Sequence, residues 1–127
     1  MNNEINTDVL IAGLGAAAYS AALYCKRYQI DTVIVGEEFG GETAIGGLIE
    51  NYPGQPDIDG FDLMMKFKEQ VDNLNTETFD SNLKSVEKIS DESFRSTLDS
   101  GEIFLSKSVI LAMGRDCLLY TSPSPRD

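Results

Sequence analysis

Histidine and tryptophan are absent from this 127-residue chain, and only two cysteines, Cys25 and Cys117, are present. Without histidine, the chain has no Ser-His-Asp or Cys-His catalytic group and no histidine-ligated metal site. Two cysteines are too few for a disulfide framework or for a four-cysteine zinc site. These classes of catalytic and metal site are therefore excluded, and we predict no metal ligands.

Basic residues are also scarce, with 10 Lys and Arg against 21 Asp and Glu and a formal net charge of −11. A surface of this sign repels nucleic-acid phosphates and anionic lipids, so we expect neither kind of partner. The N-terminal segment 1–8 is acidic, whereas a secretory signal peptide begins with basic residues. The longest apolar stretch, Val9–Leu23, contains glycines and Ser20 and is short for a membrane span. These observations predict a cytoplasmic location.

Hydrophobic residues make up 42% of the chain, which is sufficient for one folded domain. The apolar run Thr7–Ala12 predicts a strand buried on both faces, and Asp31–Val35 predicts a second one. Between them, a glycine turn leads into an alanine-rich segment, from Gly15 to about Tyr28, that predicts a helix. This order forms a βαβ unit with a right-handed crossover, and it indicates an α/β fold with a Rossmann-like parallel sheet.

The second half of the chain alternates polar turns with short apolar runs. Segment 36–59 is rich in Gly, Glu and Pro and is interpreted as a long functional loop. A helix is predicted from the N-cap Asp59, with a buried face formed by Met64, Phe67, Val71 and Leu74. Runs at 79–89, 94–98 and 103–105 predict an antiparallel meander, and 108–113 predicts a further buried strand. The first predicted helix holds three tyrosines, Tyr19, Tyr24 and Tyr28, that are expected to be packing residues with one polar end. Cys25 in the same helix has no partner cysteine and is expected to be packed, without a redox role.

Gly13, Gly15 and Ala18 form a GxGxxA pattern between the first strand and the first helix. In such a pattern the first glycine permits the tight turn, the second leaves the backbone open to a pyrophosphate, and a small third residue allows close packing. The helix N-terminus then offers free N–H groups and a partial positive charge. A glycine turn without a ligand is the alternative, but the strand-helix-strand context favours a nucleotide site.

One feature of a nucleotide site is missing from its usual place. An acidic residue at the end of the second strand commonly binds the ribose hydroxyls, but this strand ends at Val35-Gly36. Glu37 and Glu38 follow in the loop. Either glutamate could bind the ribose, the backbone could do so instead, or both glutamates could be solvated loop charges.

Four sequence blocks, in this order and spacing, resemble the low-molecular-weight thioredoxin reductase family: VLIAGLGAAAYSAALY at 9–24, GGET at 40–43, IENYPG at 49–54 and VILAMG at 109–114. The resemblance extends from about residue 7 to residue 116. Members of this family are flavoprotein disulfide reductases with a two-part FAD domain and an inserted NADPH domain. The resemblance implies a three-layer, FAD/NAD(P)-binding ββα domain with a parallel sheet and a small antiparallel meander, of which this chain holds only the first part.

The resemblance also implies which residues contact FAD. Those expected at the pyrophosphate are Gly13, Gly15, Ala16 and Ala17. Those expected near the adenosine half are Gly36, Glu37, Glu38, Ala112, Met113 and Gly114. Those expected near the ribityl, pyrophosphate and flavin parts are Gly40, Gly41, Glu42 and Asn51. Three residues depart from the family pattern, because Ala18 replaces a glycine, Glu42 replaces a common Gln and Met113 replaces a Thr.

The activity implied by the resemblance is transfer of a hydride from NADPH to FAD and then of two electrons to a CxxC disulfide. The reduced dithiol would reduce thioredoxin or a similar redox protein, and the enzyme would be a homodimer. The chain has no CxxC pair and no second glycine fingerprint, so we expect no catalytic residue and no reductase activity from it alone. Two alternatives are a flavoenzyme of the ferredoxin–NADP reductase type, without the dithiol, and a small nucleotide-binding module that is complete as it stands.

Residues 117–127, CLLYTSPSPRD, match codon by codon one reading frame of a common tagmentation sequencing adapter. A natural Ser/Pro-rich linker is the alternative interpretation. We therefore expect residues 1–116 to be the first part of the FAD-binding domain and residues 117–127 to be a non-native tail.

Overall fold

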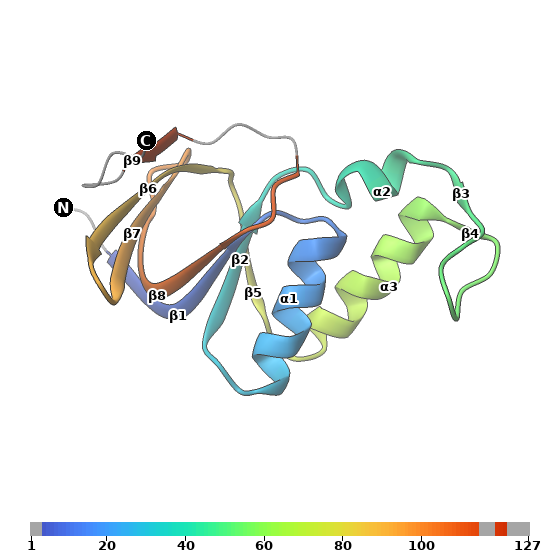
Figure 1. Cartoon of the computed structure of the whole chain (residues 1–127), viewed down its shortest axis with the longest axis horizontal. Coiled ribbons are helices and arrows are strands. Elements are labelled where there is room, and N and C mark those ends of the chain that lie inside the picture. The colour runs from blue at the N-terminus through green and yellow to red at the C-terminus, as the bar shows by residue number, and fades with distance from the viewer. Residues whose placement is uncertain (1–3, 115–118, 122–127) are drawn as a thin grey trace.

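The computed structural model of the protein describes residues 4–114 and 119–121. Its elements, labelled in Figure 1, are β1 (Glu4–Ala12), α1 (Ala16–Arg27), β2 (Thr32–Gly36), α2 (Gly41–Ile45), β3 (Leu48–Ile49), β4 (Ile58–Asp59), α3 (Gly60–Asp72), β5 (Glu77–Asp80), β6 (Leu83–Ser90), β7 (Ser93–Leu98), β8 (Ile103–Leu111) and β9 (Leu119–Thr121). The predicted tail, residues 117–127, lies outside the described residues except for β9, which pairs with β6.

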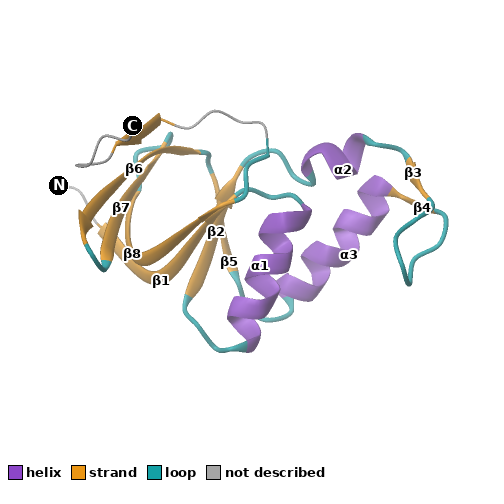
Figure 2. Cartoon of the chain, in the orientation of Figure 1, coloured by secondary structure: helices purple, strands orange, loops and turns teal. Residues whose placement is uncertain are grey.

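Seven strands form one mixed sheet in the order β5-β2-β1-β8-β7-β6-β9 (Figure 2). Strands β5, β2, β1 and β8 run parallel to one another, whereas β7 is antiparallel to both β8 and β6. The central pair, β1 and β8, runs in register from Glu4↔Ile103 to Ala12↔Leu111. This arrangement confirms the predicted α/β class, with a parallel sheet and an antiparallel meander.

The structure corrects the predicted strand boundaries in the second half of the chain. The runs 103–105 and 108–113 were expected as separate strands, but β8 spans most of both and pairs with β1 along its whole length. Conversely, the single run 79–89 is broken into β5, which joins the parallel sheet beside β2, and β6, which joins the meander. The break lies at Ser81, whose amide donates to the Phe79 carbonyl at 2.9 Å and turns the chain.

Segment 36–59 was interpreted as a loop, but it contains α2 and the two-stranded β3–β4 ladder. Gly40 begins α2 in the left-handed region, at φ +84°. The ladder is joined to α3 by the Gly60 amide, which donates to the Gly47 carbonyl at 2.8 Å. Backbone contacts of this kind leave no periodic pattern of apolar side chains, so periodicity could not detect them.

Helices α1 and α3 lie together on one face of the parallel strands (Figure 1). Ala18 and Ala22, one turn apart on α1, are fully buried, and small side chains here allow the helix to pack closely. The predicted helix from Asp59 is confirmed as α3, with Met64 and Val71 in the core. Its buried face differs slightly from the prediction, since Leu63 is also buried whereas Phe67 and Leu74 are only partly buried.

A second core covers the opposite face of the sheet. Leu10, Val33 and Val35 of the parallel strands pack there with residues of the meander, including Phe104. The Phe104 ring meets that of Phe79 edge to face, with centroids 4.9 Å apart. The chain therefore has three layers, formed by helices, parallel sheet and meander.

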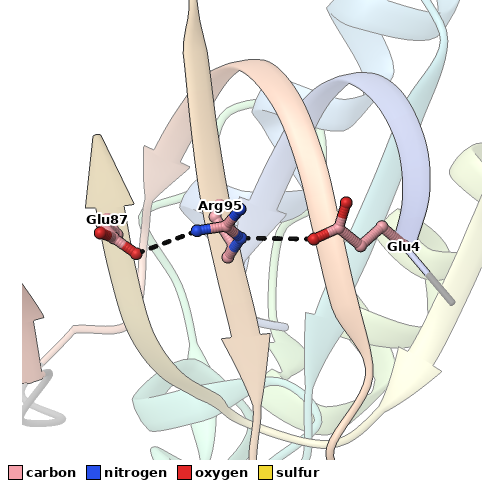
Figure 3. Close-up of polar contacts among 3 residues, drawn as sticks. All are labelled: Glu4, Glu87 and Arg95. Carbon is pink, nitrogen blue, oxygen red and sulfur yellow. Dashed lines mark hydrogen bonds and ion pairs between the residues drawn. The ribbon is translucent and has the colours of Figure 1, made fainter. Parts of the chain in front are cut away.

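Arg95 on β7 links three strands on the exposed side of the meander (Figure 3). Its Nε lies 3.4 Å from Glu4 Oε2 on β1, and its Nη1 lies 3.3 Å from Glu87 Oε1 on β6. Exposed ion pairs of this kind each contribute about 0–1 kcal/mol, so they support the strand order rather than cause it.

The outer face of α1 departs from the prediction. Tyr19 is buried as expected, but Tyr24 and Tyr28 are 62% and 76% exposed. Cys25 is partly buried and is a free thiol. Among the described residues, no helix is long and apolar enough to cross a membrane.

We predict that Asp59→Ala destabilises the protein by about 1 kcal/mol, because the Asp59 carboxylate accepts a 3.0 Å hydrogen bond from the Phe61 amide and caps α3. Asp59→Asn, which keeps an accepting oxygen, should stay within a few tenths of a kcal/mol of the wild type. Urea unfolding followed by circular dichroism measures both changes. Equal losses in the two variants would contradict the capping role.

We also predict that stability falls at alkaline pH through Tyr19. Burial raises the pKa of Tyr19 from 10.0 to about 12, and the Asp72 carboxylate adds to the shift. The unfolded chain then loses the phenol proton first, so this stabilisation is complete below pH 10 and is lost as pH rises through 12.

The full effect of that shift is roughly 3 kcal/mol. Tyr19→Phe should abolish this pH dependence in urea unfolding between pH 9 and 11, whereas Tyr28→Phe, on the exposed face of the same helix, should retain it. If Tyr19→Phe loses as much stability as the wild type over this range, another group is responsible.

Candidate functional site

A cleft of about 630 Å³ opens at the carboxyl ends of the parallel strands β1, β2 and β8. Its walls come from residues 12–17, residues 35–43, residue 45, the Asn82-Leu83 pair and residues 112–114. The loops that leave β1, β2 and β8 converge here, beside the N-terminal end of α1 (Figure 1). In open α/β sheets this edge is where ligands bind.

The structure brings nearly all the predicted site residues together in this cleft. Those that line it are Gly13, Gly15, Ala16, Ala17, Gly36, Glu37, Glu38, Gly40, Gly41, Glu42, Ala112, Met113 and Gly114. Asn51 is not among them and is exposed between β3 and β4. The lining residues that sequence reasoning missed are Ala12, Leu14, Val35, Phe39, Thr43, Ile45, Asn82 and Leu83. Thr43 belongs to the GGET block, and Phe39 and Ile45 lie next to it in the sequence. Asn82 had no signal, because its place depends on β5 pairing with β2.

The backbone at Gly13 leaves no space for a side chain. Its φ of +131° requires glycine, which agrees with the predicted tight turn. A Cβ at this position would lie 2.1 Å from the Ala112 carbonyl oxygen, so β8 approaches the turn too closely for any side chain. The Gly13 amide donates to the Val35 carbonyl and the Ala112 amide to the Ala12 carbonyl, both at 2.8 Å, which holds the three strand ends together.

The first turn of α1 faces the cleft through Ala16 and Ala17. Gly15 is the N-cap and makes no side-chain capping bond, and the first turn contains no acidic residue. The first amides of a helix have no partner within it, and the helix dipole places partial positive charge there. Lys26 and Arg27 in the last turn are placed favourably for the same dipole.

The opposite wall is also glycine backbone. The Gly40 amide donates to the Leu14 carbonyl at 2.7 Å, which ties this wall to the turn after β1. A Cβ on Gly15 would lie 3.8 Å from the Gly40 oxygen, and one on Gly41 would lie 3.8 Å from the Gly15 Cα. The two glycine backbones thus lie close to each other, and a Cβ on either residue would be in van der Waals contact with the other backbone.

The charged side chains of the cleft are all acidic. Glu37, Glu38 and Glu42 line it, and none of the described lining residues is Lys or Arg. Asn82 Nδ2 donates to Glu37 Oε1 at 3.4 Å at the rim. The described lining also contains no Cys or His.

We predict that Gly13→Ala is strongly destabilising, because it adds a clash with the Ala112 carbonyl to the cost of a positive φ. Backbone strain alone costs about 1–3 kcal/mol. Gly101→Ala is the matched control, since Gly101 also has a positive φ, +104°, but nothing lies within 4 Å of its added Cβ. Thermal unfolding should show a larger loss for Gly13→Ala. Equal losses would show that the contact with β8 contributes nothing.

Comparison with known proteins agrees with this fold. The profile of the pyridine nucleotide-disulphide oxidoreductase family matches residues 7–123. Thioredoxin reductase of Ureaplasma parvum is 35% identical over 118 residues, which are 91% of this chain and 37% of that protein. The structure of thioredoxin reductase from Streptococcus pyogenes matches with a TM-score of 0.82 and 31% identity, over 88% of this chain and 36% of its own.

A ferredoxin-flavin thioredoxin reductase from Clostridium acetobutylicum matches with a TM-score of 0.78 and 27% identity, over 87% of this chain and 38% of its own. The chain spans just over a third of the length of the thioredoxin reductases of Ureaplasma parvum and Mycoplasma pneumoniae. The family profile, the identity to these relatives and the shared fold all cover most of the chain. This chain therefore belongs to the pyridine nucleotide-disulphide oxidoreductase family.

Proposed function

We propose that this chain forms the adenosine-diphosphate half of the FAD site of a flavoprotein disulfide reductase similar to thioredoxin reductase. The observation that carries the proposal is the glycine-lined cleft at the N-terminus of α1, closed on its far side by Gly40 and Gly41. Family membership supports it, because relatives of similar sequence and fold include thioredoxin reductases.

The residues present fit a diphosphate. Gly13, Gly15, Gly40 and Gly41 present backbone and no side chain to the cleft. The first-turn amides of α1 supply donors, and a helix N-terminus stabilises negative charge. These amides also explain how a cleft with three glutamates and no described basic residue accepts a dianionic group.

In this proposal Ala16 and Ala17 hold the diphosphate, and residues 36–38 and 112–114 flank the adenosine. The contact of Asn51 with the flavin end remains a prediction from the family resemblance. Bound FAD supplies the capacity to accept a hydride and to pass on electrons, and the protein supplies binding and orientation. The described residues of the chain orient the dinucleotide and make no covalent bond to it.

The complete enzyme, in the same proposal, is a cytoplasmic homodimer that passes electrons from NADPH through FAD to a CxxC disulfide and then to thioredoxin. Residues 1–116 are the first part of its FAD-binding domain, and residues 117–127 are a non-native tail. Since the sequence has no CxxC pair, the chain alone turns over no disulfide substrate. A second candidate is a ferredoxin-linked flavoenzyme, which the name of the Clostridium acetobutylicum relative favours.

We predict that Gly15→Asp abolishes FAD binding without destabilising the fold. Gly15 has extended backbone angles, φ −98° and ψ −167°, which any residue adopts. Aspartate is a better N-cap than glycine by a few tenths of a kcal/mol. Its carboxylate, however, occupies the first-turn amides and repels the diphosphate. FAD titrations followed by amide NMR shifts measure binding, and urea unfolding measures stability.

Ser20→Asp is the matched control, because it adds the same charge to an exposed position of α1 that does not line the cleft. It should keep at least half of the wild-type FAD affinity. If millimolar FAD shifts none of the amide signals of residues 13–17 in the wild-type chain, the proposed function is wrong.

A further inference from the structure

The start of α3 contacts one wall of the cleft from outside. This far wall, residues 39–43, lies partly on α2, and α3 packs against α2 (Figure 1). Gly60 and Phe61 are the first two residues of α3, and neither is among the described residues that line the cleft. Each nevertheless contacts one end of the far wall, Gly60 at Thr43 and Phe61 at Phe39.

Gly60 is buried and leaves no space between α3 and Thr43. A Cβ at residue 60 would lie 1.9 Å from the Thr43 carbonyl oxygen and 3.4 Å from the Gly47 oxygen. The Gly60 amide donates to the same Gly47 carbonyl at 2.8 Å, which holds the contact in place. Carbon and oxygen atoms in close contact normally lie about 3.3–3.6 Å apart, so a side chain here would move the far wall by more than about 1 Å.

Phe61 holds the other end of the far wall. Its ring meets that of Phe39 edge to face, with centroids 5.6 Å apart. The Phe39 ring also meets that of the buried Tyr19 on α1, with centroids 6.1 Å apart. Phe39 is therefore held between α1 and α3, directly before the Gly40-Gly41 pair.

Met64, one turn further along α3, contacts the middle of the far wall. It is fully buried, and a Cβ on Gly40 would lie 3.4 Å from its Cγ. The Gly40 amide donates to the Leu14 carbonyl at 2.7 Å on the other side. The far wall is thus packed between α3 and the turn that precedes α1.

We infer that Gly60 and Phe61 are positioning residues for the dinucleotide, because they set the distance between the far wall and the N-terminus of α1. The inference rests on the proposed function and adds two residues outside the cleft to those that determine its affinity. A wall displaced by 0.5–1 Å loses roughly a quarter to a half of the dispersion energy of each contact with a ligand. Only a ligand that reaches both walls is sensitive to this displacement.

FAD and AMP differ in this respect. In the proposed function FAD extends from the adenosine past the diphosphate and the Gly40-Gly41 pair. AMP carries the adenosine and a single phosphate, which the first-turn amides of α1 hold. Each is titrated into the full chain and followed by amide NMR shifts, and the ratio of the FAD affinity to the AMP affinity is compared between variants.

Gly60→Ala should lower the FAD affinity roughly tenfold and change the AMP affinity less than twofold, because it displaces only the far wall. Gly46→Ala is the matched control. Gly46 is the exposed C-cap of α2 at φ −79°, and its added Cβ would lie no closer than 3.4 Å to its neighbours. This control should leave the ratio within twofold of the wild type.

Phe61→Ala tests the other end of the far wall and decides the matter if Gly60→Ala does not fold. Phe61 is 49% exposed, so its truncation leaves the core intact. Loss of the ring contact with Phe39 should lower the ratio about threefold. Met65→Ala removes a side chain of similar exposure, 44%, from the same helix without touching the lining of the cleft, and it should leave the ratio unchanged.

The outcomes separate this inference from the proposed function. If FAD does not bind the wild type, the proposed function fails and this inference fails with it. If FAD and AMP bind but Phe61→Ala keeps the wild-type ratio, the inference alone is overturned. An equal loss of both affinities in a folded Gly60→Ala variant also overturns it, because it would show a merely structural role. Binding of FAD without binding of AMP overturns it as well, since the α1 side would then have no affinity of its own.

Discussion

The backbone contact between the turn after β1 and the end of β8 is the constraint on which the cleft depends. Two hydrogen bonds, from the Gly13 amide to the Val35 carbonyl and from the Ala112 amide to the Ala12 carbonyl, hold the ends of β1, β2 and β8 next to one another. This arrangement is possible only because residue 13 has no side chain that would clash with the Ala112 carbonyl. Since α1 begins directly after this turn, its first amides are held in the cleft by the same contact.

A protein with a net negative charge that binds an anionic ligand must attract that ligand through interactions that act over short distances. The formal charge of −11 and the glutamates of the cleft are unfavourable for a phosphate at long range. Exposed charges are screened over about 8 Å at physiological ionic strength. Backbone amides at a helix N-terminus instead act by direct contact, where screening has little effect. In the proposed FAD site, the fold thus places short-range donors where the diphosphate would lie against the backbone.

Sequence reasoning predicted the first half of the fold better than the second, and the physical reasons are local. The βαβ unit was predictable because its strands are apolar on both faces and its glycine turn has fixed spacing. Helix α3 was predictable because Asp59 caps a periodic apolar segment. The division of run 79–89 was not, because Phe79, Leu83 and Val86 are apolar on both sides of the turn at Ser81.

In the candidate site, too, some residues could be predicted from the sequence and others could not. Glycine positions of the cleft were predictable because a motif encodes them in a few consecutive residues. The approach of Asn82 to Glu37 was not, because it results from β2 and β5 pairing across a long stretch of chain. Burial on α1 was mispredicted for Tyr24 and Tyr28, since tyrosine is compatible with either face of a helix and composition does not choose between them.

The pairing of β1 with β8 has a consequence for synthesis of the chain. β1 begins at Glu4, whereas the strand that covers its second edge begins at Ile103. A nascent polypeptide emerging from the ribosome therefore carries its central strand with one open edge until almost all of the described segment has been translated. Such non-local pairings form slowly, and open strand edges favour association with other chains. The centre of the sheet is therefore completed late, when β8 pairs with β1.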